Sequence, residues 1–138
     1  MSRASTAPVA ATPLSFLAFD YGAKRVGAAI GNTLTHRAQP LHTIAERGEA
    51  RFAAIARLIA EWQPSALVVG VPFHPDGAAH DNTERSRRFA RQLQGRFHLP
   101  VHEVDERYTT TEAASAGARD LDAASAAIIL NQFLTNLE

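Results

Sequence analysis

Two apolar segments joined by a short polar turn constrain the fold of this 138-residue chain more than any other feature. Residues 14–21 form an apolar run that carries one carboxylate, Asp20, near its end, and residues 26–31 return as a second run of small apolar side chains. Lys24 and Arg25 lie in the turn between them. The pattern predicts two antiparallel strands. A carboxylate is costly in an apolar strand unless it reaches the exposed end or meets a cation, so Asp20 is a candidate functional residue.

Composition limits the remaining choices. The chain has no cysteine, which excludes disulfides and thiolate metal sites. A hydrophobic fraction of 46% is sufficient for one core, and we expect a single domain over residues 14–138. Residues 1–13 are rich in Ala, Ser, Thr and Pro and have no continuous apolar segment, so we expect a disordered tail rather than a secretory signal. No apolar run is long enough to span a membrane, and a cytoplasmic location is expected.

The rest of the chain alternates between helical and extended patterns. Phe52, Ile55, Ile59 and Trp62 recur at spacings of three and four, which predicts a helix with one apolar face. A third short strand and then alternating helices and strands are predicted over residues 40–44, 46–62, 66–71, 82–97, 101–105 and 122–137. An antiparallel strand meander followed by β-α-β units predicts an α/β fold. Its mixed sheet would carry helices on both faces.

Acidic residues fall at places that such a sheet brings together. Asp20 ends the first strand, Asp105 and Glu106 end the last strand, and Asp122 begins the last helix. Sites in sheets of this kind form at the carboxyl ends of the parallel strands. We therefore expect these acids to converge at one edge. Gly27 and its small neighbours suit either a nucleic-acid backbone or close packing of the last helix.

Each acid also has a purely structural interpretation. Asp20 is a residue type that begins Asx turns. Asp122 and Asp120 are both candidates for the N-cap of the last helix. Because neighbouring side chains alternate along a strand, only one of Asp105 and Glu106 should face the site. Glu106 lies just past the strand end, where it could pair with Arg107 instead. We favour Glu106 slightly as the ligand, and Asp105 stays a candidate.

Charge is distributed unevenly although the net charge is zero. Residues 84–98 carry five arginines and one glutamate, and residues 99–138 carry seven acids. Arg85 and Arg88 can lie near one face of the predicted helix, where they would contact phosphates or simply face solvent. Lys24 and Arg25, beside Asp20, allow the same two interpretations.

Four segments, in order along the chain, resemble motifs of the YqgF family, also called RuvX, the pre-16S rRNA nucleases. Residues 20–29 resemble its DxGxKRxGxA opening, and residues 70–77 resemble its GxP…DG loop. Residues 105–113 are similar to its DERxTTxEA block, and residues 122–130 to its DxxAAxxIL helix. One such motif is weak, but four collinear motifs are specific.

This resemblance implies an RNase H-like fold, shared with Holliday-junction resolvases of the RuvC type. It also implies a hydrolase: a metal-dependent endonuclease that processes the 5′ end of precursor 16S rRNA in ribosome biogenesis and associates with the small ribosomal subunit. Mg²⁺ or Mn²⁺ is the implied cofactor, because hard cations prefer carboxylate oxygens. The implied site residues are the acids Asp20, Asp105, Glu106 and Asp122, with metal held by Asp20, Glu106 and Asp122, and the nucleic-acid contacts Lys24, Arg25, Arg85, Arg88, Arg107 and Thr109.

Two alternatives stay open. The same chemistry would serve a Holliday-junction resolvase acting on branched DNA, and a non-catalytic nucleic-acid-binding module would retain the fold.

The chain also departs from the family pattern between Glu112 and Asp122, where the segment is shorter than usual and only Arg119 remains of a basic cluster. We expect a weaker grip on substrate from that side.

Overall fold

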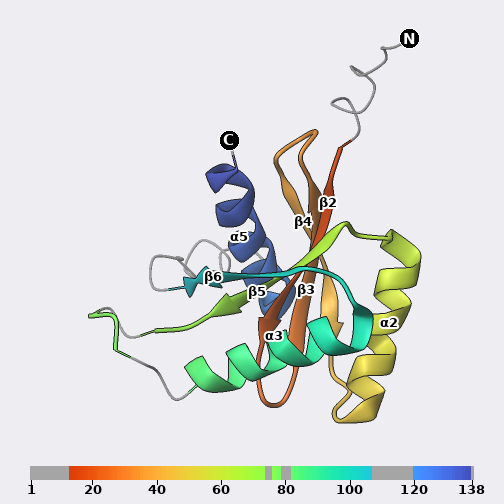
Figure 1. The fold of residues 1–138 in the computed structure, drawn as a ribbon, viewed down its shortest axis with the longest axis vertical. Coiled ribbons are helices and arrows are strands. Elements are labelled where there is room, and N and C mark those ends of the chain that lie inside the picture. The colour runs from red at the N-terminus through yellow and green to blue at the C-terminus, as the bar shows by residue number, and fades with distance from the viewer. Residues whose placement is uncertain (1–12, 74–75, 79–81, 107–119, 138) are drawn as a thin grey trace.

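The computed structural model describes residues 13–73, 76–78, 82–106 and 120–137. Within them the chain forms one five-stranded sheet in the order β4-β3-β2-β5-β6, packed against helices (Figure 1). The strands are β2 (Ser15–Tyr21), β3 (Val26–Asn32), β4 (Ala38–Ile44), β5 (Ala66–Val71) and β6 (Val101–Asp105). The helices are α2 (Glu49–Trp62), α3 (Thr83–Phe97) and α5 (Leu121–Asn136).

The first two apolar segments form the predicted hairpin. β2 pairs with β3 in antiparallel register, so that Asp20 lies opposite Gly27 and Tyr21 opposite Val26. Gly22 lets the turn close tightly, because a Cβ there would lie 2.7 Å from the carbonyl oxygen of Arg25. β4 continues the meander, whereas β5 and β6 run parallel to β2. This mixed sheet is the one predicted from the sequence.

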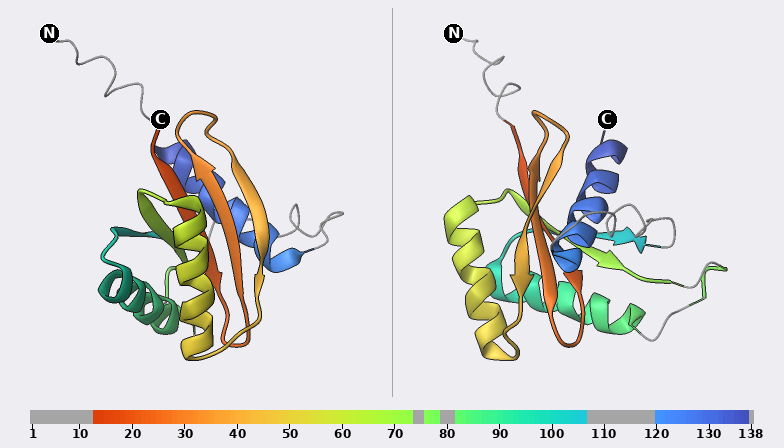
Figure 2. Two further views of the ribbon diagram at one scale, coloured as in Figure 1. Left: turned by 90° about the vertical axis from the view of Figure 1, so that its right-hand side faces the viewer. Right: turned by 180° about the vertical axis from the view of Figure 1, so that it is seen from behind.

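Helices cover both faces of the sheet, as expected. Figure 2 shows α2 and α3 on one side and α5 on the other. Alternation along β2 separates the two cores. Leu17 and Phe19 pack towards α2 and α3, and Phe16 and Ala18 pack towards α5. Asp20 continues the row that faces α5, while Tyr21 packs with the opposite core.

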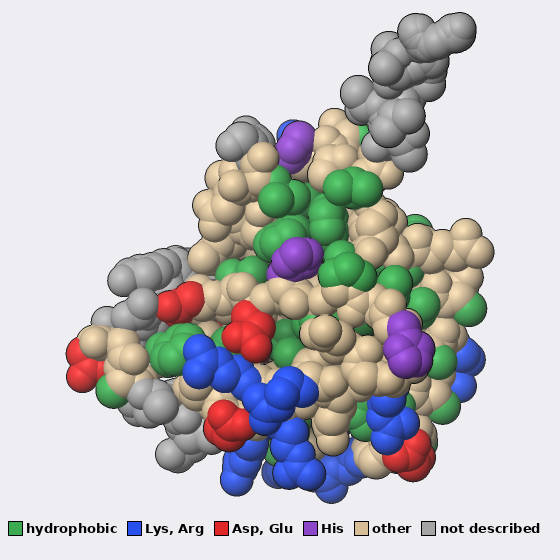
Figure 3. All heavy atoms as spheres, viewed as in Figure 1, with side chains coloured by type: hydrophobic (Ala, Val, Ile, Leu, Met, Phe, Trp, Pro, Cys, Tyr) green, Lys and Arg blue, Asp and Glu red, His purple; other side chains and the backbone are tan. Residues whose placement is uncertain are grey.

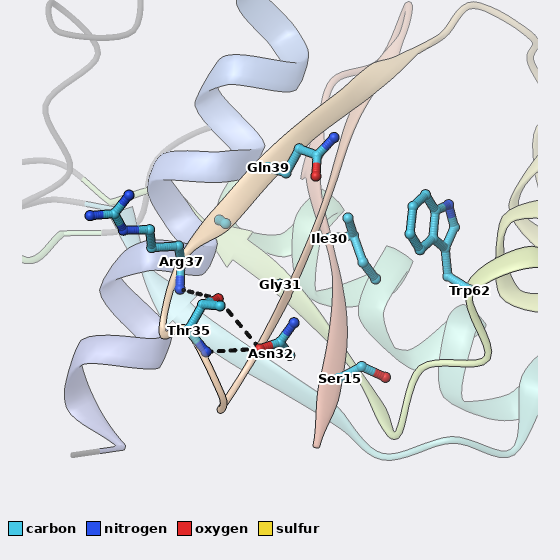
Figure 4. Close-up of a pocket in the computed structure, with 9 residues that line it drawn as sticks. Ser15, Ile30, Gly31, Asn32, Thr35, Arg37, Gln39 and Trp62 are labelled. Carbon is cyan, nitrogen blue, oxygen red and sulfur yellow. Dashed lines mark hydrogen bonds between the residues drawn. The ribbon is translucent and has the colours of Figure 1, made fainter. Parts of the chain in front are cut away.

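The predicted inner face of α2 was only partly right. Ile55 is buried as expected, together with Ala54 and Leu58, but Trp62 is 37% exposed. Trp62 is the last residue of α2, where the helix reaches the end of the sheet. Its ring lines an open cleft of about 480 Å³ with Ile30 and seven further residues (Figure 4).

The ends of the predicted elements also shift slightly. α2 begins at Glu49 rather than at residue 46, directly after Gly48, whose φ of 59° is a left-handed conformation. Leu137, the last residue of the helix predicted over residues 122–137, follows the end of α5 and is 48% exposed. No helix within the described residues is both long and apolar enough to cross a membrane.

Candidate active site

Asp20 and Glu106 come together at the carboxyl ends of β2 and β6. β5 lies between these strands, yet the two side chains share a hydrogen bond. Gly70 of β5 makes this contact possible, because a Cβ at that position would lie 2.8 Å from Cδ of Glu106. The glycine therefore leaves the surface of β5 open, and the Glu106 side chain lies against it.

Burial shifts the pKa of both carboxyls upwards. Loss of solvent raises the pKa of Asp20 to about 6, and the negative charge of Asp122 adds to the shift. The pKa of Glu106 rises to about 8, mainly through burial and then through the charge of Asp20 and the hydrogen bond to it. Their hydrogen bond lowers the pKa of Asp20 and raises that of Glu106. Near neutral pH Glu106 is therefore the protonated partner, which donates the hydrogen bond, and Asp20 accepts it. Carboxyls confined in this way favour the arrival of a cation.

Asp120, not Asp122, caps α5. The Asp120 carboxylate accepts a hydrogen bond from the backbone N–H of Ala123 at 3.0 Å, and it also accepts the hydroxyl of Thr43 on β4. Asp122 lies in the first turn of α5 and does not serve as its N-cap. Its Oδ2 atom is 2.6 Å from Nε of Arg25, in the turn between β2 and β3.

The start of α5 rests directly on β3. A Cβ on Gly27 would lie 1.9 Å from the carbonyl oxygen of Asp122, so only glycine permits this approach. Gly27 is the residue opposite Asp20 in the hairpin. The small side chains of β3 thus serve helix packing, one of the two interpretations considered from the sequence, and they bring Asp122 near Asp20.

Asp105 is half-buried at the end of β6, paired with Val71. Val104 packs into the core beneath α5, so alternation places Glu106 rather than Asp105 on that face of the sheet. The charge of Asp105 nevertheless adds to the raised pKa of Glu106. Of the two adjacent acids, Glu106 is the one in contact with Asp20.

The basic candidates fall into two groups. Lys24 and Arg25 line a shallow pocket of about 240 Å³ together with Asp122. Arg85 and Arg88 lie on α3 and line a separate cavity. Arg107, Thr109 and the shortened segment before Asp120 fall outside the described residues.

The site's fit to a metal ion depends on Asp122. Within the described residues, no three His, Cys, Asp or Glu side chains are grouped closely enough to hold a metal. Asp20 and Glu106 form a pair, and Asp122 is turned towards Arg25. Their oxygens suit Mg²⁺ or Mn²⁺, which keep several water ligands and need few carboxylates. The residues fit such an ion if Asp122 exchanges Arg25 for the cation.

Sequence reasoning missed two supporting residues. Gly70 interrupts a run of apolar and β-branched residues, and a glycine inside a strand signals close approach of another group. Thr43 gave no signal, because its link to Asp120 depends on how β4 and α5 pack.

The fold and the acids at its edge define a class of protein. RuvC of T. thermophilus, solved in complex with a Holliday junction substrate, superposes with a TM-score of 0.57 at 15% identity, covering 90% of this chain and 95% of that chain. Such low identity shows the fold alone, which is RNase H-like.

The family is shown by sequence. A family model described as "RuvX: Holliday junction resolvase" matches residues 14–136, and the chain belongs to this family. A protein of Albidiferax ferrireducens is 67% identical over 129 residues, covering 94% of this chain and 83% of the relative. One of Polaromonas sp. is 59% identical over 137 residues, covering 99% of both. Both carry the name "Putative pre-16S rRNA nuclease". The family inferred from the four motifs is confirmed.

Proposed function

We propose that this protein is a divalent-metal-dependent endonuclease that processes the 5′ end of precursor 16S rRNA. The observation that carries the proposal is the hydrogen-bonded pair of Asp20 and Glu106, with Asp122 close enough to influence the Asp20 pKa. The names of the relatives support the choice of substrate. This substrate implies a cytoplasmic location and association with the small ribosomal subunit.

Asp20, Glu106 and Asp122 would hold Mg²⁺ or Mn²⁺. When bound, such an ion makes a water nucleophilic at neutral pH and neutralises the charge on the leaving oxygen. Glu106 must first release the proton that it shares with Asp20. Asp105, the residue before Glu106, raises the pKa of the Glu106 carboxyl through its charge.

The cations of the chain would position the substrate. Arg25 forms an ion pair with Asp122. If Asp122 binds the metal ion instead, the Arg25 guanidinium is available to bind a phosphate oxygen. Lys24 lies in the same turn and lines the same pocket. Arg107 and Thr109 belong to the family motif and are proposed as further phosphate contacts, with Arg85 and Arg88 on α3.

One assay tests the proposal. The protein and an Asp20→Asn variant are incubated with precursor 16S rRNA, a four-way DNA junction and an unrelated single-stranded RNA, with and without Mn²⁺. Metal-dependent cutting of the precursor alone, lost in the variant, supports the proposal. Absence of cutting with any divalent metal overturns it and favours a non-catalytic binding module.

A second candidate function is Holliday-junction resolution. The description of the family model and the RuvC-like fold favour it. It predicts paired symmetric cuts in the DNA junction, which requires two copies of the site related by symmetry. Cutting of the junction in preference to the precursor would replace the first proposal by this one.

A further inference from the structure

Four of the five arginines of α3 form two rows with different partners. Arg87 and Arg91 belong to the first row. Nη2 of Arg91 lies 2.7 Å from Oε2 of Glu84, and Nε of Arg87 lies 3.4 Å from Oε1 of Glu103. Carboxylates therefore balance the charge of this row.

The second row has no such balance. Arg85, Arg88 and Gln92 follow one another at spacings of three and four, so they share one face of the helix. Within the described part of the chain, neither Arg85 nor Arg88 forms an ion pair, and Arg85 donates only a long hydrogen bond of 3.4 Å to the amide oxygen of Asn82. Figure 3 shows Lys and Arg side chains gathered over the part of the surface where α3 lies.

These three side chains and Tyr21 line a cavity of about 250 Å³. The Tyr21 ring is held in place by Phe89, with ring centroids 4.9 Å apart, and by the Arg51 guanidinium 5.7 Å from the ring centre. The cavity thus combines an amide, a fixed aromatic ring and two guanidinium groups that have no carboxylate partner among the described residues. Guanidinium groups match phosphate oxygens, and aromatic rings and amides are groups that contact nucleosides.

Its position relates the cavity to the acids. Tyr21 directly follows Asp20, and Cα atoms of consecutive residues are about 3.8 Å apart. Side chains of neighbours point to opposite faces, so the cavity lies on the α3 side of the sheet and the acids on the α5 side. A chain that occupies both must bend around the carboxyl end of β2.

We propose that the cavity lined by Tyr21, Arg85, Arg88 and Gln92 binds a phosphate and its nucleoside in a single-stranded segment flanking the bond that is cut. The inference rests on the proposed function and specifies its substrate class. A single strand bends sharply at little cost, whereas a duplex is stiff over many base pairs. The substrate at the site is therefore an unpaired RNA end or loop rather than a continuous duplex.

Binding measurements with the full chain test this. Anisotropy of a labelled single-stranded RNA spanning the 5′ cleavage site is compared for the wild type, Arg85→Ala/Arg88→Ala, and Arg91→Ala as the matched control from the balanced row. The double variant should bind at least tenfold more weakly. It should also lose about 0.7 from the slope of log affinity against log salt for each phosphate contact removed. The control should stay within twofold of the wild type.

A conservative variant and a second ligand separate specific contact from general charge. Arg88→Lys should keep most of the affinity, and duplex RNA of the same length should bind equally to the wild type and the double variant. Unchanged single-strand binding by the double variant, or an equal loss for the duplex, overturns the inference. Both arginines are exposed, so we expect an unchanged melting temperature.

The two proposals fail separately. If the wild type cuts the precursor but the double variant binds single strands normally, the cavity inference is wrong and the nuclease function stands. If the wild type cuts nothing, the nuclease function is wrong. Loss of single-strand binding in the double variant would then still support the cavity as a nucleic-acid site.

Discussion

The carboxyl groups of Asp20, at the end of β2, and Glu106, just after β6, share a hydrogen bond. The two strands do not pair with each other, because β5 lies between them. The pair retains a proton at a pH where ordinary carboxyls are ionised. Its energetic consequences can be measured in the absence of any substrate.

Stability without metal should fall as the pH rises. The pKa of Asp20 is raised from 3.8 to about 6 and that of Glu106 from 4.5 to about 8, so the folded state binds more protons than the unfolded state between these limits. Stabilisation by these protons is complete below about pH 4 and is lost as the pH rises through 8. Urea unfolding in EDTA across this range measures the trend.

A Glu106→Gln variant provides the control, because it cannot ionise at that position. Its stability should depend much less on pH over the same range. The lowered pKa values of Asp120, Glu49 and Glu84 act in the opposite direction, because their stabilising effect is lost as the pH falls through about 4.5 and below, at the acid end of this range. They are the same in both proteins and therefore cancel in the comparison. Equal slopes for both proteins would contradict the assignment of the raised pKa to this pair.

Added metal should reverse the loss. Mg²⁺ or Mn²⁺ bound by the acids stabilises only the folded state, by an amount that grows with the ratio of free metal to its Kd. At a hundredfold excess over Kd the gain is about 2.7 kcal/mol, which corresponds to several degrees in Tm. Differential scanning calorimetry at pH 8 should show this shift in the wild type and not in Asp20→Asn. Equal shifts would remove Asp20 from the metal site.

Replacing Gly70 should separate the two carboxyls. A methyl group there would lie 2.5 Å from Cδ1 of Ile129 and 2.8 Å from Cδ of Glu106, so both side chains must move. We expect Gly70→Ala to cost about 1–3 kcal/mol through overpacking. Cutting should fall far more than stability explains, because Glu106 is displaced from Asp20. Full activity at normal metal concentration would show that the contact is not needed.

Much of the fold and part of the candidate site could be predicted from the sequence, for physical reasons. Apolar periodicity located the strands and helices, because burial imposes a repeat of two or of about 3.6 residues. Because residues at the carboxyl ends of parallel strands meet at one edge of a sheet, the sequence also predicted that Asp20 and Glu106 lie close together. The choice between Glu106 and Asp105 needed the register of β6. The Arg25–Asp122 contact joins residues 97 positions apart, and no local pattern encodes it.

Gly27→Ala should disturb the start of α5 severely. The added Cβ would lie 1.9 Å from the Asp122 carbonyl oxygen, a backbone atom that moves only with the helix. We expect a loss of about 3 kcal/mol or more and a shift of Asp122 away from Asp20. Gly95→Ala is the matched control, because Gly95 lies within α3 and a Cβ added there would have nothing within 4 Å. That substitution should stabilise by about 0.5–1 kcal/mol. Denaturant midpoints of the two variants should therefore move in opposite directions.

Asp120 and Asp122 should separate stability from activity. Asp120→Ala removes the cap of α5 and its link to Thr43, and N-cap losses cost about 1 kcal/mol. Asp122→Asn removes a partly exposed ion pair with Arg25, which contributes less than about 1 kcal/mol. The proposed metal role of Asp122 instead requires that its variant lose metal-dependent cutting while Asp120→Ala retains it. Paired measurements of Tm and cleavage rate test this. Loss of cutting in Asp120→Ala with normal cutting in Asp122→Asn would reverse the assignment, because the side chain that caps the helix would then also be the one required for catalysis.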